Sequence, residues 1–490
     1  MTVARGLIGN SLAWATASSL GTQALSFVTF AVLARLLGAE AFGLVALATL
    51  AIDLLLVVST AGMSEAVIQR STLEEEDADT AFWTNVVCGA SFCLITFAAA
   101  PLVARLFGQP QLDPIIKALA SIFAITPLGA IHNARLTRDL HFKSVALRNM
   151  VASLAGIAIG LPLAFAGYGV WALVWQRIAV ALGLALSAWI GMPWVPRMRF
   201  RWQSCKQMLR FGASIGASTT FNQINIRAAE VISGALFGPI AVAFIRAGSR
   251  IVEVLNQITY MPFQQIAMPL LARTTKDRDQ TQATYLRLSR LSAFIMFPAF
   301  FGCFALAEEI VGIIFGPNWA SVADALRIFS CAVVASQMNN LIIAAITAAG
   351  ASRTVLSWTV TQIALGITAA VAVSHWGWQA MLMTGVLRGY LVLPYAFCLL
   401  HRHVGIRFRD VLVSLRPGLV SAITMMIAVS LGAQVSREVL TGPTTIAIWM
   451  PVGLLTYFCL YILQDRSILT QMRNVSDTAL HRFSSSRPTN

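Results

Sequence analysis

Long apolar stretches alternate with short polar or basic loops along almost the whole chain. A membrane-spanning helix needs about 20 mostly apolar residues, and fourteen stretches fit this pattern. The pattern therefore predicts an all-α polytopic membrane protein with fourteen transmembrane helices. The predicted spans are Ser11–Ala34, Phe42–Ile68, Phe82–Ala104, Pro114–Ala134, Met150–Gly167, Val170–Ile190, Gly212–Leu236, Ile240–Met268, Leu291–Leu306, Val322–Ala348, Thr354–Val373, Gln379–Leu400, Pro417–Ala433 and Thr444–Leu463.

Composition agrees with lipid as the main solvent. Hydrophobic residues make up 57% of the 490 residues and charged residues only 11%, whereas soluble domains carry roughly 25% charged residues. So few charges could not cover the surface of a soluble protein of this length.

The distribution of basic residues predicts the orientation. The chain has 35 Lys and Arg against 21 Asp and Glu, a net charge of +14. If the N-terminus is cytoplasmic, the loops on that side carry 25 Lys and Arg, while the opposite loops carry three, Arg35, Arg105 and Arg437. Because cytoplasmic loops collect Lys and Arg, we expect both termini inside. The positive charge then reflects topology, and no nucleic-acid partner is needed to explain it.

Three pairs of similar segments indicate an internal repeat. LLGAEAFG resembles LFGPIAVA, RLFGQPQ resembles IIFGPNW, and GYGVWAL resembles HWGWQAM, at offsets of 200 to 208 residues. This offset spans six predicted helices, an even number, so the copies are parallel repeats and the substrate path is expected between them. The predicted parts are two six-helix bundles (1–205 and 206–405), two additional C-terminal helices (406–465) and a cytoplasmic tail (466–490).

Ionisable residues inside the predicted spans are candidates for the binding site, because each costs about 2.5–3.5 kcal/mol or more in lipid. The predicted seventh helix carries Asn225, Arg227 and Glu230, and the eighth carries Arg246, Arg250 and Glu253. Arg227 and Glu230, like Arg250 and Glu253, are three residues apart, so each pair is either part of a site or a neutral pair that joins helices.

Arg246 has no acidic residue at helical spacing and is therefore the strongest candidate for binding an anion. Asp53 corresponds to Glu253 in the repeat, and these two carboxylates are candidates for ion coupling. Arg177, Arg327 and Arg388 occur singly, which favours helix packing or snorkelling.

No catalytic or cofactor motif emerges from the sequence. The segment His401–Arg402–His403 has no carboxylate or cysteine at ligand spacing, so we expect no metal site. There is no phosphate-binding Walker loop for ATP. The seven cysteines form neither a disulfide framework nor a metal pattern. These features favour a carrier for an anionic, polar cargo over an enzyme.

Several segments resemble the Wzx-type polysaccharide flippases of the multidrug/oligosaccharidyl-lipid/polysaccharide exporter superfamily, in the branch that handles colanic acid, succinoglycan and teichuronic acid. The resemblance is carried by VLARLLGAEAFGLVAL, LTRDLHFKSVALRNMVASLAG, AGYGVWALVWQ and IIFGPNW. It implies two six-helix bundles plus two helices, a location in the bacterial inner membrane, and an undecaprenyl-pyrophosphate-linked oligosaccharide as cargo. It also implies polymerase and chain-length proteins of the same pathway as partners.

Two alternative functions remain open. A drug/cation antiporter of the same superfamily would usually have twelve helices and a cavity rich in carboxylates. A membrane polysaccharide polymerase or ligase would usually need a large external loop with catalytic Arg or His, and the outside loops here are short.

The 25-to-3 distribution of basic residues leads to a test of topology. Reporter fusions after Arg35, Arg70, Gln434 and Gln464 should read outside, inside, outside and inside, because the basic loops stay in the cytoplasm. An outside signal from the fusion after Gln464 would contradict fourteen spans with both ends inside.

Overall fold

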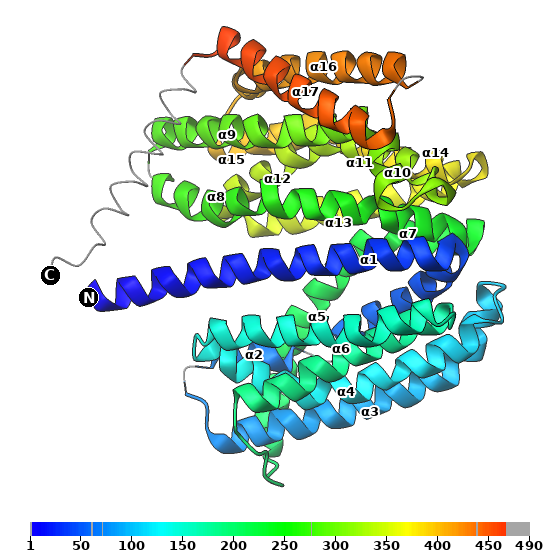
Figure 1. Ribbon diagram of the computed structural model, residues 1–490. Coiled ribbons are helices and arrows are strands. Elements are labelled where there is room, and N and C mark those ends of the chain that lie inside the picture. Colours follow the sequence, from blue (N-terminus) through cyan, green and yellow to red (C-terminus); the bar gives the residue numbers. More distant parts are fainter. Residues whose placement is uncertain (1, 60–61, 71, 276, 438–439, 467–490) are drawn as a thin grey trace, which may run out of the picture. The chain divides into compact units, whose positions relative to one another are not determined.

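The structure of the chain, a computed structural model, describes residues 2–59, 62–70, 72–275, 277–437 and 440–466 (Figure 1). Within helices, the side chains of 2–20, 57–58, 213–222, 224–226, 228, 352–353 and 356 are also outside the description. Apart from Arg466, the predicted tail over 466–490 lies outside the described residues.

Throughout the described residues, the regular elements are helices, as the apolar pattern predicted. The first seven are α1 (Thr2–Ser59), α2 (Met63–Gln69), α3 (Glu75–Leu106), α4 (Leu112–Arg138), α5 (Phe142–Phe165), α6 (Val170–Gly191) and α7 (Trp202–Thr259). Then come α8 (Met261–Thr274), α9 (Arg278–Ala305), α10 (Ala307–Ile314), η1 (Pro317–Trp319), α11 (Val322–Cys331), α12 (Val333–Ala348) and α13 (Ser352–Val373). The last are η2 (Ser374–Trp376), α14 (Trp378–Leu391), α15 (Leu393–Val404), α16 (Phe408–Ser436) and α17 (Gly442–Gln464).

Eleven described helices are long and apolar enough to cross a membrane, or twelve if α11 and α12, bent by 45°, form one span. The chain is therefore a multi-pass membrane protein. The count differs from fourteen partly because α1 and α7 each join two helices at a glycine. The number fourteen stays a prediction.

Glycine is required at both of these breaks. Gly38 has φ 77° and ψ 169°, and Gly238 has φ 79° and ψ −173°, a region of backbone conformation that is essentially restricted to glycine. No atom lies within 4 Å of a Cβ added at either position, so the backbone conformation, and not crowding, excludes other residues. In Figure 1 the ribbon of α1 turns back at its far end, next to this break.

Contacts divide the chain into two compact units. The first contains Met1–Ala247 and Ile314–Trp319, and the second contains Gly248–Ile313 and Ala320–Asn490. In the first unit, α5 packs on α6, α3 on α4, and α4 on α6, while α1 contacts α4 and α5. In the second, α9 and α17 both pack on α16, and Tyr457 of α17 donates a hydrogen bond to the Phe294 carbonyl of α9 at 3.0 Å.

Several helices begin earlier than the hydropathy predicted. The predicted spans at Met150, Leu291 and Pro417 belong to α5, α9 and α16, which start at Phe142, Arg278 and Phe408. Lys and Arg are good helix formers, so a helix continues through a charged end that an apolar window leaves out.

The segment Ile314–Trp319 is packed into the first unit by its aromatic rings. Trp319 is 1% exposed, and its indole Nε1 donates to the Ala34 carbonyl oxygen at 3.1 Å. Its ring meets those of Phe42 and Phe244 edge-on, at centroid distances of 5.8 and 6.1 Å. Ala34 lies one turn before the break at Gly38, where helical carbonyls lose their partners, so Trp319 caps this helix end.

Replacing Trp319 with alanine should therefore lower the free energy of unfolding by about 3–5 kcal/mol, through the cavity and the lost cap. Trp319→Phe should cost less, because it keeps most of the buried ring. Calorimetry in detergent measures both. Trp376→Ala is the control, since Trp376 is 71% exposed. Equal melting temperatures for Trp319→Ala and Trp376→Ala would contradict the packing role.

Candidate substrate-binding site

The break at Gly238 folds the two arms of α7 so that Glu230 and Arg246 meet. Each lies eight residues from the break, one before and one after it. Arg246 Nη2 is 2.9 Å from Glu230 Oε2, and Arg246 Nε donates to the same oxygen at 3.1 Å. Arg227 Nη1 donates to Glu230 Oε1 at 3.0 Å. One carboxylate, 4% exposed, therefore holds two guanidinium groups.

Arg246 is also held by the part of α1 that follows Gly38. Its Nη1 donates to Thr49 Oγ1 at 2.6 Å and to the Ala46 carbonyl at 3.3 Å. No acidic residue lies at helical spacing from Arg246, as the sequence indicated. Its partner Glu230 comes from the other arm of the same helix.

Asp53 lies one turn after Thr49 on α1 and forms an ion pair with Arg177 of α6. Both are close enough to interact electrostatically with Arg246. The two groups, Glu230 with its arginines and Asp53 with Arg177, therefore form one charged region in the first unit. Arg177 was predicted to serve helix packing or snorkelling, and this ion pair between α1 and α6 agrees with helix packing.

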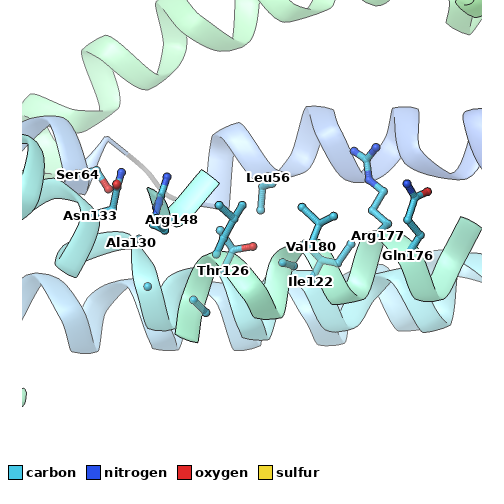
Figure 2. A pocket seen from close by; sticks show the side chains of 14 residues that line it. Leu56, Ser64, Ile122, Thr126, Ala130, Asn133, Arg148, Gln176, Arg177 and Val180 are labelled. Carbon is cyan, nitrogen blue, oxygen red and sulfur yellow. The ribbon is translucent and has the colours of Figure 1, made fainter. Parts of the chain in front are cut away.

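A cavity of about 500 Å³ opens beside this region, between α1, α4, α5 and α6. Arg177 and Gln176 lie near one end of it, and Arg148, Asn133 and Ser64 gather at the other (Figure 2). Apolar side chains, among them Leu56, Ile122 and Val180, line the stretch between the two ends. The cavity is thus a mostly apolar slot with a cation at each end.

Sequence reasoning missed Arg148, Asn133 and Gln176. Arg148 was placed in a loop because the predicted span began at Met150, yet α5 begins at Phe142 and places Arg148 in its second turn. A uniform hydropathy window cannot detect one arginine in the first turns of a helix. Lys and Arg are good helix formers, and this propensity over residues 142–149 would have been the useful signal.

The other predicted site residues fall into two groups. Arg250 and Glu253 lie in the second unit, where Arg250 Nη1 donates to Glu253 Oε2 at 3.1 Å. The side chain of Asn225 lies outside the described residues.

Two further single arginines also have partners in the second unit. Arg327 Nη2 donates to Glu308 Oε1 at 2.7 Å, and this hydrogen bond holds the pKa of Glu308 below its ordinary value. This bond between α10 and α11 agrees with the helix-packing role predicted for Arg327. Arg388 donates to the Gln362 carbonyl, which agrees with the predicted packing role.

The chain is similar to known proteins in sequence and in fold. The sequence model of a family described as "Polysaccharide biosynthesis protein" matches residues 32–324. The chain is similar to the succinoglycan biosynthesis transport protein ExoT of Rhizobium meliloti, with 24% identity over 97% of each chain. It is also similar to the lipopolysaccharide biosynthesis protein WzxC of Escherichia coli, with 24% identity over 86% of each chain.

Among solved structures, the lipid II flippase MurJ in an inward closed conformation has a similar fold. The TM-score is 0.76 at 13% sequence identity, and the match covers 93% of this chain and 99% of MurJ. The resemblance to polysaccharide exporters found in the sequence is confirmed at the level of family and fold.

The geometry around Glu230 leads to a prediction about stability. Glu230→Gln should lower the free energy of unfolding by about 3–5 kcal/mol, because it leaves two partly buried guanidinium groups without their shared, buried carboxylate. Arg246→Ala should cost less, since Glu230 keeps Arg227. Melting temperatures in detergent test this order.

Glu253→Gln is the matched control, because it removes one carboxylate from a partly exposed pair, and such pairs contribute about 1 kcal/mol or less. If Glu230→Gln melted no lower than Glu253→Gln, the shared carboxylate would have no special role.

Proposed function

Because the chain belongs to the polysaccharide biosynthesis protein family, we propose that it flips an undecaprenyl-pyrophosphate-linked oligosaccharide from the cytoplasmic to the outer leaflet. The membrane is the bacterial inner membrane, and the mechanism is alternating access. The observation that carries the proposal is the charged region around Glu230, in which arginines outnumber carboxylates inside membrane-spanning helices.

Charge counting supports an anionic cargo. The charged region holds three arginines and two carboxylates, and Arg148 at the other end of the adjoining cavity raises the excess to two positive charges. This excess attracts a pyrophosphate diester, which carries about two negative charges near neutral pH. Guanidinium groups bind phosphate oxygens through paired hydrogen bonds. The residues of the region and cavity are Arg148, Arg177, Arg227, Arg246, Asp53 and Glu230.

Within this proposal, Arg246 and Arg227 bind the pyrophosphate and Glu230 positions them when the site is empty. Arg250 and Asn225, also on α7, stay candidates for binding the anion. The carboxylates of Asp53 and Glu253 are the candidates for coupling to an ion.

The membrane potential supports the direction of transport. A negative charge that leaves a negative-inside cytoplasm gains about 2.3 kcal/mol per 100 mV. The pyrophosphate is therefore pulled outward, and the empty, positively charged site is pulled back inward. This cycle does not require a second cargo.

The glycine pairs support a parallel repeat of two six-helix bundles. Gly38 and Gly238, Gly108 and Gly316, and Gly169 and Gly377 all have positive φ angles. In the proposed arrangement both termini are cytoplasmic, residues 406–465 add two helices, and polymerase and chain-length proteins receive the exported units.

The alternatives fit the charged residues less well. A cation antiporter needs a site with an excess of carboxylates, yet arginines outnumber carboxylates around Glu230 and Asp53. A polymerase or ligase would need a reactive constellation, and the region around Glu230 offers only charge and hydrogen bonds. We therefore propose transport and not catalysis.

Arg246→Ala should abolish polysaccharide export and cause lipid-linked units to accumulate in the cytoplasmic leaflet, while protein levels stay close to normal. Arg246→Lys should restore export only in part, because an ammonium cannot form the paired bonds of a guanidinium. Complementation of a deletion strain, with membrane immunoblots, measures both effects.

Arg199→Ala is the control, since Arg199 is an exposed arginine in the loop between α6 and α7. Normal export by Arg246→Ala would refute the proposed anion site.

A further inference from the structure

The end of the cavity around Arg148 has unused hydrogen-bonding capacity. Arg148 Nη2 donates to Asn149 Oδ1 at 3.0 Å, but its Nε is buried without a partner. Among the described residues, no carboxylate oxygen lies within 4.0 Å of its guanidinium nitrogens. A guanidinium in a membrane-spanning helix, facing a cavity without a counter-charge, is a functional site by default.

Asn133, at the same end of the cavity, lacks a hydrogen-bond donor for its side-chain oxygen. Its Oδ1 is buried and accepts no hydrogen bond. A buried acceptor left in this state costs about 1–3 kcal/mol. Ser64 adds a hydroxyl beside these two side chains (Figure 2). A ligand that satisfies this end must therefore offer an anionic acceptor for Arg148 and a donor for Asn133.

We infer that this end of the cavity binds an acidic sugar of the glycan, with the carboxylate on Arg148 and a ring hydroxyl on Asn133. The inference rests on the proposed function only for the arrival of a glycan. A pyrophosphate diester fits less well, because it has ionised oxygens but no hydroxyl to donate to Asn133.

The rest of the cavity suits a sugar ring. Its volume of about 500 Å³ falls within the range that is usual for ligand sites. Leu56 and Val180 offer an apolar wall for the ring, and Thr126 and Gln176 offer polar groups for further hydroxyls. Arg148 thus selects for an acidic sugar, while Arg246 binds the pyrophosphate that every cargo carries.

Binding to the purified full-length protein tests this assignment. Titration with D-glucuronate, D-glucose and inorganic pyrophosphate, followed by saturation-transfer difference NMR, separates the three chemistries. We expect Arg148→Ala to weaken glucuronate binding about tenfold or more, as for the loss of a charge-assisted hydrogen bond, and to leave glucose and pyrophosphate binding unchanged.

Two further variants complete the test, a second substitution of Arg148 and a control on the same helix. Arg148→Gln preserves much of the side chain without its charge and replaces Arg148→Ala if that variant does not fold. Lys143→Ala removes an exposed charge from the same helix and should bind like the wild type. Unchanged glucuronate binding by Arg148→Ala and Arg148→Gln would overturn the inference, as would a selective loss of pyrophosphate binding or no glucuronate binding by the wild type.

Export in cells separates this inference from the proposed function. In hosts that build either an acidic or a neutral repeat unit, Arg148→Ala should reduce export of the acidic glycan alone. Loss of both exports would place Arg148 with the pyrophosphate and overturn the inference. Failure of the wild type to export either glycan would refute the proposed function, while the glucuronate titration would still decide the role of Arg148.

Discussion

Charge buried in an apolar surrounding has to be neutralised within the chain, and this constraint organises the first unit. Glu230 forms ion pairs with Arg227 and Arg246, and Asp53 forms an ion pair with Arg177. Thr49 and Asp53, one turn apart on α1, bring the two groups into one region. Removing Glu230 would leave two cations in a low dielectric without their carboxylate, and removing Asp53 would leave one. The packing of α1, α6 and α7 therefore depends on where these two acidic side chains lie.

The backbone has to bring these partners together, and glycine makes this possible. Only a reversal with positive φ at Gly238 places Glu230 opposite Arg246. A Cβ added to Gly43 would lie 2.0 Å from the Pro239 carbonyl oxygen, so the helix after Gly38 packs directly on the backbone that follows Gly238. The charged region is therefore coupled to the two breaks, and Trp319 closes the end of the helix that precedes Gly38.

The helical architecture and the family could be predicted from the sequence, because long apolar stretches and family motifs each lie within one contiguous segment of the chain. The partner of Arg246 could not be found from helical spacing, although the equal distance of Glu230 and Arg246 from Gly238 contains that information. Arg148 was missed because hydropathy cannot locate the charged first two turns of a helix. The pairing of Arg177 with Asp53 joins residues 124 positions apart, and no spacing rule predicts such a contact.

The region is nevertheless not fully neutral, because arginines outnumber carboxylates. A region with one carboxylate for each arginine would be more stable in the empty state, but it would have no net attraction for an anion. In this chain two arginines share the single carboxylate of Glu230, and Arg148 faces the cavity with its Nε unpaired. Interactions with an anion that these arginines do not make in the empty protein can form when an anionic group binds. Enough carboxylates are present to keep the arginines folded inward, and too few to compete with a pyrophosphate or a sugar carboxylate. The excess of cations over carboxylates thus connects the stability of the fold to the chemistry of the proposed cargo.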